Sequence, residues 1–351
     1  MNKLFLLDAY ALIYRAYYAL IKNPRINSKG FNTSAVLGFV NTLEDVLKKE
    51  NPSHIGVAFD PSGPTFRHEA YEQYKAQREE TPEVIRLSVP IIKDIIRAYQ
   101  IPILEVPGYE ADDVIGTLAT EAGKQGIMTY MMTPDKDYGQ LVSENVFMYR
   151  PKYGDKEFEV MGIEQVKAKF DIQSPLQVID MLGLMGDSSD NIPGCPGVGE
   201  KTAQKLIAQF GSIENLLAHT DELKGALKTK VETNKELITF SKFLATIKTD
   251  VPIKLQLEEL ERKHPMKPPC EKFSTRWNSV HLANASSNVR LRKIFLSQSQ
   301  PPRKKFSQTC SANNSPCSML HKQIRRIFKG ISLTNSRATG KINPNFRFSR
   351  V

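Results

Sequence analysis

The chain has 351 residues, of which 40% are hydrophobic and 25% charged, a composition that fits a globular protein and excludes a fibrous or wholly disordered one. Its length suits one large domain or two to three small ones. The formal net charge of +10 is unevenly distributed, because residues 266–351 carry +16 and residues 1–265 carry −6. An argument for nucleic-acid binding must therefore come from local features of an acidic body.

Residues 263–351 form a basic tail that is rich in Ser and Asn and lacks long amphipathic periodicity. Three interpretations are open: an arm that grips DNA, a disordered appendage, or the product of out-of-frame translation. We favour the last, because codons that start one nucleotide before that of Met266 can encode an acidic amphipathic stretch. We expect the tail to be disordered, and the nucleotide sequence past the codon for Val351 would test its origin.

The start of the chain lacks the apolar length of a membrane span or an export signal. The run Leu4–Leu7 is cut by Asp8. With four cysteines and no export signal, we predict a cytoplasmic protein that makes no membrane contact.

Short apolar runs and helical patterns alternate along the first 132 residues. Strands are predicted at residues 3–7, 55–59, 101–106 and 127–132, and helices at residues 11–20, 35–49 and 111–124. Buried-type strands separated by helices are typical of an α/β fold with a parallel sheet.

Acidic residues follow each of the four predicted strands. They are Asp8, Asp60, Glu110, Asp112, Asp113, Asp135 and Asp137. Because the carboxyl ends of parallel strands share one edge of the sheet, we expect these side chains to converge there. Two like charges about 4 Å apart repel by about 4 kcal/mol at an effective dielectric of 20, so such a cluster requires cations. Oxygen ligands without nearby His or Cys favour Mg²⁺ or Mn²⁺.

Each acid taken alone has a simpler explanation. Asp8 or Asp60 could cap a helix. Asp112 and Asp113 could be acids in a first helical turn, where the helix dipole favours them, and residues 135–137 could form a solvated turn. The repetition at four strand ends is what favours a metal site.

A second acidic segment precedes a glycine-rich turn. Asp187 and Asp190 are three residues apart and share a face of a helical turn, although a plain loop is the alternative. The turn, residues 194–202, leads into an amphipathic helix at residues 203–210, and glycines there let backbone N–H groups approach an anion. Cys195 stands where a nucleotide P-loop requires Gly. A helix-hairpin-helix contact to a DNA backbone therefore fits better.

The segment 66–78 places cations and aromatic rings at helical spacing. The residues are Arg67, Tyr71, Tyr74, Lys75 and Arg78. One helix face could thus clamp a phosphate and stack bases, and a solvated amphipathic helix is the alternative.

Six segments together resemble a known family. They are LFLLDAYALIYRAYYAL, GVAFD, FRHEAYEQYKAQR, GYEADDVIGTLA, TPDKDYGQLV and GDSSDNIPGCPGVGEKTA. In order and spacing they are similar to the 5′–3′ exonuclease domain of bacterial DNA polymerase I, in the flap-endonuclease family, over residues 1–261. The resemblance implies a parallel-sheet, PIN-like nuclease core at residues 1–173 with a helical arch at about residues 61–90. An all-α helix–three-turn–helix DNA-binding subdomain would follow at residues 174–262.

The resemblance also assigns roles by position. It implies a first metal site of Asp8, Asp60, Glu110 and Asp112, and a second of Asp113, Asp135, Asp137, Asp187 and Asp190, holding two Mg²⁺ or Mn²⁺ ions. It makes Lys75 and Arg78 catalytic, and implies that K⁺ could bind backbone carbonyls of the turn. The DNA-binding residues would be Arg67, Tyr74, Gly194, Gly197, Gly199, Lys201 and Thr202.

The implied activity is a monomeric, structure-specific 5′–3′ exonuclease or 5′-flap endonuclease. It would hydrolyse DNA, and RNA primers, at a flap, nick or 5′ end by a two-metal-ion mechanism in replication and repair. The tail departs from the family, so we expect a truncated polymerase I exonuclease domain or a stand-alone nuclease. A DNA-binding fragment with little or no catalysis and a PIN-type ribonuclease are the alternatives.

Overall fold

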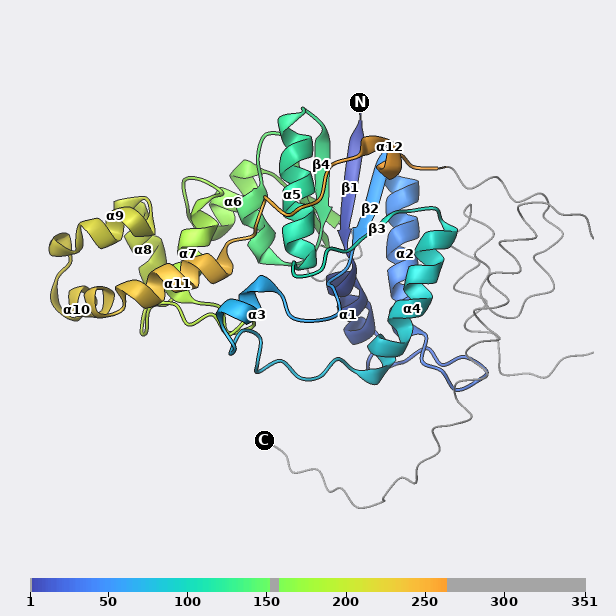
Figure 1. The fold of residues 1–351 in the computed structure, drawn as a ribbon, viewed down its shortest axis with the longest axis horizontal. Coiled ribbons are helices and arrows are strands. Elements are labelled where there is room, and N and C mark those ends of the chain that lie inside the picture. Colours follow the sequence, from blue (N-terminus) through green and yellow to red (C-terminus); the bar gives the residue numbers. More distant parts are fainter. Residues whose placement is uncertain (1, 152–157, 264–351) are drawn as a thin grey trace, which may run out of the picture. The chain divides into compact units, whose positions relative to one another are not determined.

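The computed structural model describes residues 2–151 and 158–263, which form a six-stranded sheet flanked by helices (Figure 1). The strands are β1 (Lys3–Asp8), β2 (His54–Ala58), β3 (Ile103–Leu104), β4 (Met128–Met132), β5 (Val146–Pro151) and β6 (Phe158–Met161). Their order is β3-β2-β1-β4-β5-β6, with β6 antiparallel to β5 and every other pair parallel. The predicted α/β fold with a mostly parallel sheet is confirmed, and the sheet extends by β5 and β6 beyond the four predicted strands.

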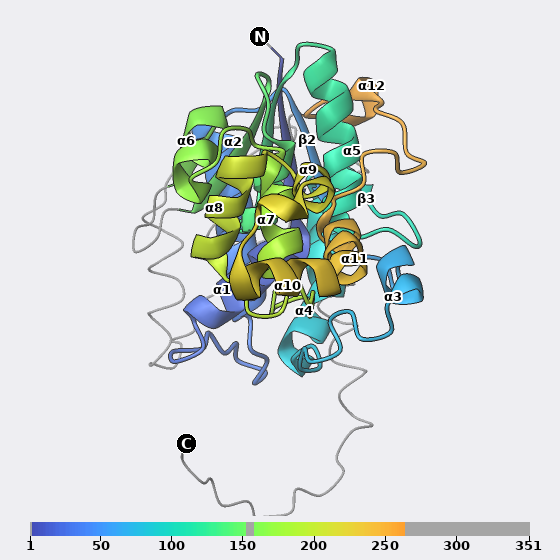
Figure 2. The same ribbon diagram turned by 90° about the vertical axis from the view of Figure 1, so that its left-hand side faces the viewer.

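Alternate residues of β1, in the middle of the sheet, are buried on opposite faces of the sheet, as the two-residue period of a strand requires. The helices of this part are α1 (Ala9–Ala19), α2 (Ser34–Lys49), α3 (Phe66–Ala70), α4 (Glu83–Ala98) and α5 (Ala111–Lys124). Phe5 and Leu7 pack with α1, α2 and α4, whereas Leu4 and Leu6 pack with α5. Figure 1 shows α2 and α4 on one side of the sheet and α5 on the other, and Figure 2 gives the view from the left of Figure 1, with α5 nearer the viewer than α2.

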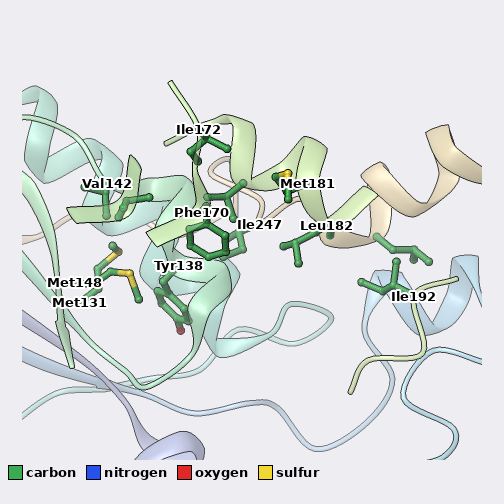
Figure 3. Close-up of a cluster of buried hydrophobic side chains, with 14 of the residues drawn as sticks. Met131, Tyr138, Val142, Met148, Phe170, Ile172, Met181, Leu182, Ile192 and Ile247 are labelled. Carbon is green, nitrogen blue, oxygen red and sulfur yellow. The ribbon is translucent and has the colours of Figure 1, made fainter. Parts of the chain in front are cut away.

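A continuous apolar core joins the sheet to the helical part that follows it. The remaining helices are η1 (Lys136–Leu141), α6 (Ile163–Phe170), α7 (Gln177–Met185), α8 (Glu200–Phe210), α9 (Ile213–Ala218), η2 (Thr220–Glu222), α10 (Gly225–Thr233), α11 (Lys235–Ala245) and α12 (Leu257–Leu260). Met131 and Met148 of the sheet belong to the same buried cluster as Met181 of α7 and Ile192 (Figure 3). This packing fixes the loop after α7 relative to the strand ends.

The prediction of one helix over residues 66–78 is wrong. Helix α3 ends at Ala70, and the chain continues in turns, with Lys75 in the left-handed region at φ 56°. The Lys75 N–H donates to the carbonyl of Asp190 at 3.0 Å and not to the preceding helical turn. At Lys75 a contact with a distant loop thus takes the place of a helical hydrogen bond.

The third strand is shorter than predicted, at residues 103–104 in place of 101–106. Pro102 lacks an N–H, so it contacts the sheet only through its carbonyl, which accepts a hydrogen bond from the Val57 N–H at 3.0 Å. None of the helices within residues 2–151 and 158–263 has the length and apolar character needed to cross a bilayer. Our expectations for the tail concern residues 264–351, which lie outside the described residues.

Candidate metal and nucleic-acid site

Asp8 lies at the end of the central strand, and both of its carboxylate oxygens are engaged. Oδ1 caps α1 by accepting from the Ala11 N–H at 3.1 Å, and Oδ2 accepts from the hydroxyls of Thr133 and Tyr138 at 3.2 Å each. Burial, and then the charges of Asp60 and Asp135, raise the pKa of Asp8 to about 7. The helix cap considered from the sequence is thus real, and it coexists with a place among other acids.

The ends of β2 and the start of α5 meet beside Asp8. Asp60 Oδ1 accepts from the Ala111 N–H at 2.7 Å, which holds the first turn of α5 against the end of β2. Carboxylate oxygens of Glu110, Asp112 and Asp113 lie within 4.8 Å of one another. Desolvation and the charge of Glu110 raise the pKa of Asp60, and desolvation and the charge of Asp113 raise the pKa of Asp112.

Asp113 is buried and forms a paired contact with Arg67. Oδ1 accepts from Arg67 Nη2 and from the Lys248 N–H, both at 2.8 Å, and Oδ2 accepts from Arg67 Nη1 at 2.8 Å and the Glu110 N–H at 3.1 Å. Arg67 also donates to the carbonyls of Leu244 and Thr246, and its side chain is only 2% exposed. This arrangement favours anchoring roles for Arg67 and Asp113 over the predicted contacts to DNA and metal.

Four acids approach from η1 and from the loop after α7. Asp135 caps η1 by accepting from the Asp137 N–H at 3.0 Å, and Lys136 between them pairs with Asp187 at 2.6 Å. Desolvation within the crowded site raises the pKa of both Asp135 and Asp137, although the Asp135 side chain is exposed at the surface. The charge of Asp190 adds to the rise at Asp135, and the charge of Asp135 adds to the rise at Asp137. Burial alone would raise the pKa of Asp187, but Lys136 and Ser189 lower it.

Lys75 and Arg78 face the acidic cluster. Lys75 Nζ lies 2.6 Å from Glu110 Oε1 and 3.6 Å from Asp190, and Arg78 pairs with Asp190. Burial would raise the pKa of Glu110, but Lys75 and Arg67 outweigh it and lower that pKa. Tyr74 is buried, and its hydroxyl donates to Glu110 at 2.9 Å and to Asp190 at 3.1 Å.

All nine predicted acids are therefore linked through hydrogen bonds, ion pairs and mutual charge. Among them, Glu110 and Asp187, which pair with Lys75 and Lys136, have a lowered pKa, whereas five others have a raised pKa. These five are Asp8, Asp60, Asp112, Asp135 and Asp137. Desolvation is the largest cause in each of the five, and a neighbouring carboxylate adds to it, so the site without metal disfavours their charged forms.

A divalent cation fits this donor set. Oδ1 of Asp137 is buried, and within the described residues it has no hydrogen-bond partner. Buried polar atoms normally find a partner, so an orphan oxygen among like charges indicates a ligand position. The clustered donors are carboxylate oxygens, which suits a hard ion such as Mg²⁺ or Mn²⁺.

We expect Asp8→Asn to stabilise the protein in EDTA at pH 8. Since the folded state raises this pKa, the stability due to protonated Asp8 is complete below about pH 4 and is lost as the pH rises through 7. The gain in the free energy of unfolding should reach about 4 kcal/mol at most, which is the equivalent of raising the pKa of Asp8 from 3.8 to about 7. Urea unfolding at pH 4 and pH 8 measures it. A variant that is less stable than wild type at pH 8 would contradict the argument.

The glycine-rich turn lies between α7 and α8 and leaves the N-terminus of α8 exposed. Gly194 has φ 63°, and a side chain there would come within 2.3 Å of the Gly186 nitrogen. Gly199 caps α8 without a side chain, and Lys201 is exposed in the first turn, next to half-buried Thr202.

Lys230 of α10 reaches the same turn, because its Nζ would lie only 2.5 Å from a Cβ placed on Gly197. The sequence analysis missed Lys230, since nothing in the sequence pattern brings α10 to this place. It also missed Lys136, although its position between two acids was a visible signal.

Comparisons with known proteins cover most of the chain. A model described as "5′-3′ exonuclease, N-terminal resolvase-like domain" matches residues 3–171, and one described as "5′-3′ exonuclease, C-terminal SAM fold" matches residues 173–268. The 5′-3′ exonuclease of Aquifex aeolicus is 39% identical over 265 residues, which are 76% of this chain and 88% of that protein.

DNA polymerase I of Bacillus caldotenax is 44% identical over 261 residues, or 74% of this chain and 29% of that protein. The chain thus spans about 29% of the length of that relative. Among solved structures, the bacteriophage T5 D15 flap endonuclease in complex with DNA and metal ions superposes with a TM-score of 0.59. At 20% identity, over 71% of this chain and 90% of that one, this likeness concerns the fold alone.

Proposed function

Because the chain belongs to the 5′–3′ exonuclease family, we propose that it hydrolyses DNA phosphodiester bonds at a 5′ end, a nick or a 5′ flap. The observation that carries this proposal is the convergence of nine acids from several strand ends and two loops, five of them with raised pKa. RNA primers are proposed as further substrates, in replication and repair, with the protein acting as a cytoplasmic monomer.

We propose that two divalent cations bind the acidic cluster. One would be held by Asp8, Asp60, Glu110 and Asp112, and the other by Asp135, Asp137, Asp187 and Asp190. When bound, such ions would activate a water molecule and stabilise the leaving 3′ oxygen. Asp113 would support the first group through Arg67, since both of its oxygens already accept hydrogen bonds from the protein.

Lys75 and Arg78 would act on the phosphate itself. Both cations border the cluster through Glu110 and Asp190, so they lie where a bound phosphodiester would develop negative charge. Tyr74 is buried behind them, and its hydroxyl orients Glu110. Tyr74 would therefore support the site, and we no longer place it among the groups that contact DNA.

We expect Lys75→Ala to slow single-turnover cleavage by about 100- to 1,000-fold, the usual cost of removing one group that stabilises developing charge. Its affinity for DNA should change by much less, because the other cations and the turn still hold the duplex. Lys124→Ala is the matched control, since exposed Lys124 ends α5 about 20 Å from the acids at its start. Equal loss of affinity with unchanged turnover would show that Lys75 only forms part of a solvated face.

Duplex DNA would lie on the turn at residues 194–202. Backbone N–H groups at the start of α8, with Lys201 and Lys230, supply positive potential without reading bases. K⁺ bound to backbone carbonyls of this turn stays a prediction from the resemblance.

Lys230→Ala should weaken duplex binding several-fold and reduce the slope of log affinity against log salt by about 0.9, the value for one phosphate contact. Fluorescence anisotropy at several salt concentrations measures both quantities, with Lys124→Ala as control. An unchanged slope would remove Lys230 from the interface.

The proposed function is tested by incubating the full chain with a labelled 5′-flap duplex in Mg²⁺, in Mn²⁺ and in EDTA. We expect cleavage near the junction with either metal and none in EDTA. Single-stranded RNA and a blunt duplex without a flap serve as comparison substrates. Cleavage confined to single-stranded RNA would identify a PIN-type ribonuclease, and binding without metal-dependent cleavage would identify a DNA-binding module.

A further inference from the structure

Two segments that are more than 100 residues apart are joined side by side at the site. We name residues 73–78 the strap and residues 187–192 the aspartate loop. The loop is closed at its base by reciprocal hydrogen bonds between the backbones of Asp187 and Ile192, at 2.9 and 2.8 Å. The strap carries Lys75 and Arg78, and the loop carries Asp187 and Asp190.

Consecutive carbonyls of the aspartate loop accept hydrogen bonds from the strap. The Ser188 carbonyl accepts from Gln77 Nε2, the Ser189 carbonyl from Arg78 Nε at 3.0 Å, and the Asp190 carbonyl from the Lys75 N–H at 3.0 Å. In the opposite direction, Asn191 Nδ2 donates to the carbonyl of Gln73 at 2.6 Å. The strap is thus held at its first residue by Asn191 and further along by loop carbonyls.

The backbone at Asn191 requires a special residue. Its φ of 58° lies in the left-handed region, which Asn and Gly tolerate better than most residues. Asn therefore meets two demands at once, because it accepts this conformation and its side chain reaches the strap. Asn191 also lies three residues before Gly194, so the loop that holds the strap continues into the proposed duplex-binding turn.

We propose that Asn191 is a positioning residue that sets the place of Lys75 and Arg78 relative to the acidic cluster. This inference rests on the proposed nuclease function. Lys75 Nζ is 2.6 Å from Glu110 because the strap backbone places it there. Without the Asn191 contact the Gln73 end of the strap loses one of its hydrogen bonds to the aspartate loop and can shift. A displacement of about 1 Å at a reacting group can cost about 100-fold in rate.

Asn191→Gly is the decisive variant, since Gly accepts the left-handed backbone and removes only the side chain. We expect single-turnover cleavage of the 5′-flap duplex to fall about 10- to 100-fold, with little change in duplex affinity. Asn191→Asp should lose at least as much, because a carboxylate oxygen would face the Gln73 carbonyl. Asn51→Gly is the matched control, because Asn51 is also left-handed, at φ 46°, and lies just before β2, at the other end of that strand from Asp60.

Two further measurements separate positioning from general stability. In a Lys75→Ala, Arg78→Ala background, Asn191→Gly should cost less than threefold, because the groups that it positions are gone. An equal loss in both backgrounds would overturn the proposal.

Limited trypsin digestion, which needs no activity, should cut after Lys75 and Arg78 faster in Asn191→Gly than in wild type. Unchanged trypsin cleavage together with wild-type turnover would also overturn it. If wild type itself does not cleave DNA, the proposed function fails, while faster digestion of the variant would still support the structural role of Asn191.

Discussion

Replacing Asp112 or Asp135 by Asn should lower cleavage of a 5′-flap duplex by about 1,000-fold or more. Each substitution removes one charge from a cluster that is expected to hold cations. A metal ion contributes several kcal/mol to stabilisation of the transition state, and each 1.4 kcal/mol changes the rate about tenfold. Single-turnover rates at saturating protein, over a range of Mn²⁺ concentrations, measure the effect. Metal affinity measured by calorimetry should fall in parallel.

The stability of these variants should not fall. Burial and then the charge of Asp113 raise the pKa of Asp112. Desolvation among neighbouring groups raises the pKa of Asp135, and the charge of Asp190 adds to it. A neutral amide therefore relieves repulsion in the metal-free protein. Asp221→Asn is the matched control, because Asp221 is exposed in η2. Cleavage at the wild-type rate by Asp112→Asn or Asp135→Asn would refute the site assignment.

The acidic site was predictable because it depends on a rule of sheet geometry. Asp8 ends β1, and Asp60 follows β2, which is parallel to β1 and next to it in the sheet. The hydrogen bond from the Ala111 N–H to Asp60 holds the start of α5 beside them. The simpler roles considered for these acids are also present, since Asp8 caps α1 and Asp135 caps η1. Local capping and convergence at the sheet edge use the same residues, which explains why neither explanation excluded the other.

The strap could not be predicted, because its conformation depends on a partner more than 100 residues away. Residues 66–78 have helical spacing, but the Lys75 N–H donates to the carbonyl of Asp190 and not to a preceding helical turn, and the Arg78 side chain donates to the carbonyl of Ser189. Sequence periodicity indicates which residues could share a helix face, but it does not indicate whether a backbone N–H will bond to a carbonyl that is distant in sequence. The same limit applies to Arg67, which looked like a surface cation and is buried against Asp113.

Arg67→Met should destabilise the protein by about 3–5 kcal/mol, the usual cost of removing one partner from a buried ion pair. Arg67 joins three segments that are distant in sequence: α3, the start of α5 through Asp113, and the end of α11 through the carbonyls of residues 244 and 246. The variant would leave the Asp113 carboxylate buried without its cation. Urea unfolding of the full chain, followed by circular dichroism, measures the change.

Two companion variants decide between this anchoring role and the contact to DNA predicted from the sequence. Adding Asp113→Asn to Arg67→Met should recover part of the lost stability, since it removes the uncompensated charge. The recovery is partial because the amide oxygen can accept from only one of the two backbone N–H groups, of Glu110 and Lys248, that Asp113 now binds. Arg78→Met should change the unfolding free energy by less than about 1 kcal/mol, because the Arg78 side chain is 52% exposed. If Arg67→Met instead keeps wild-type stability and weakens duplex binding, Arg67 contacts DNA and the buried ion pair does not hold the fold together.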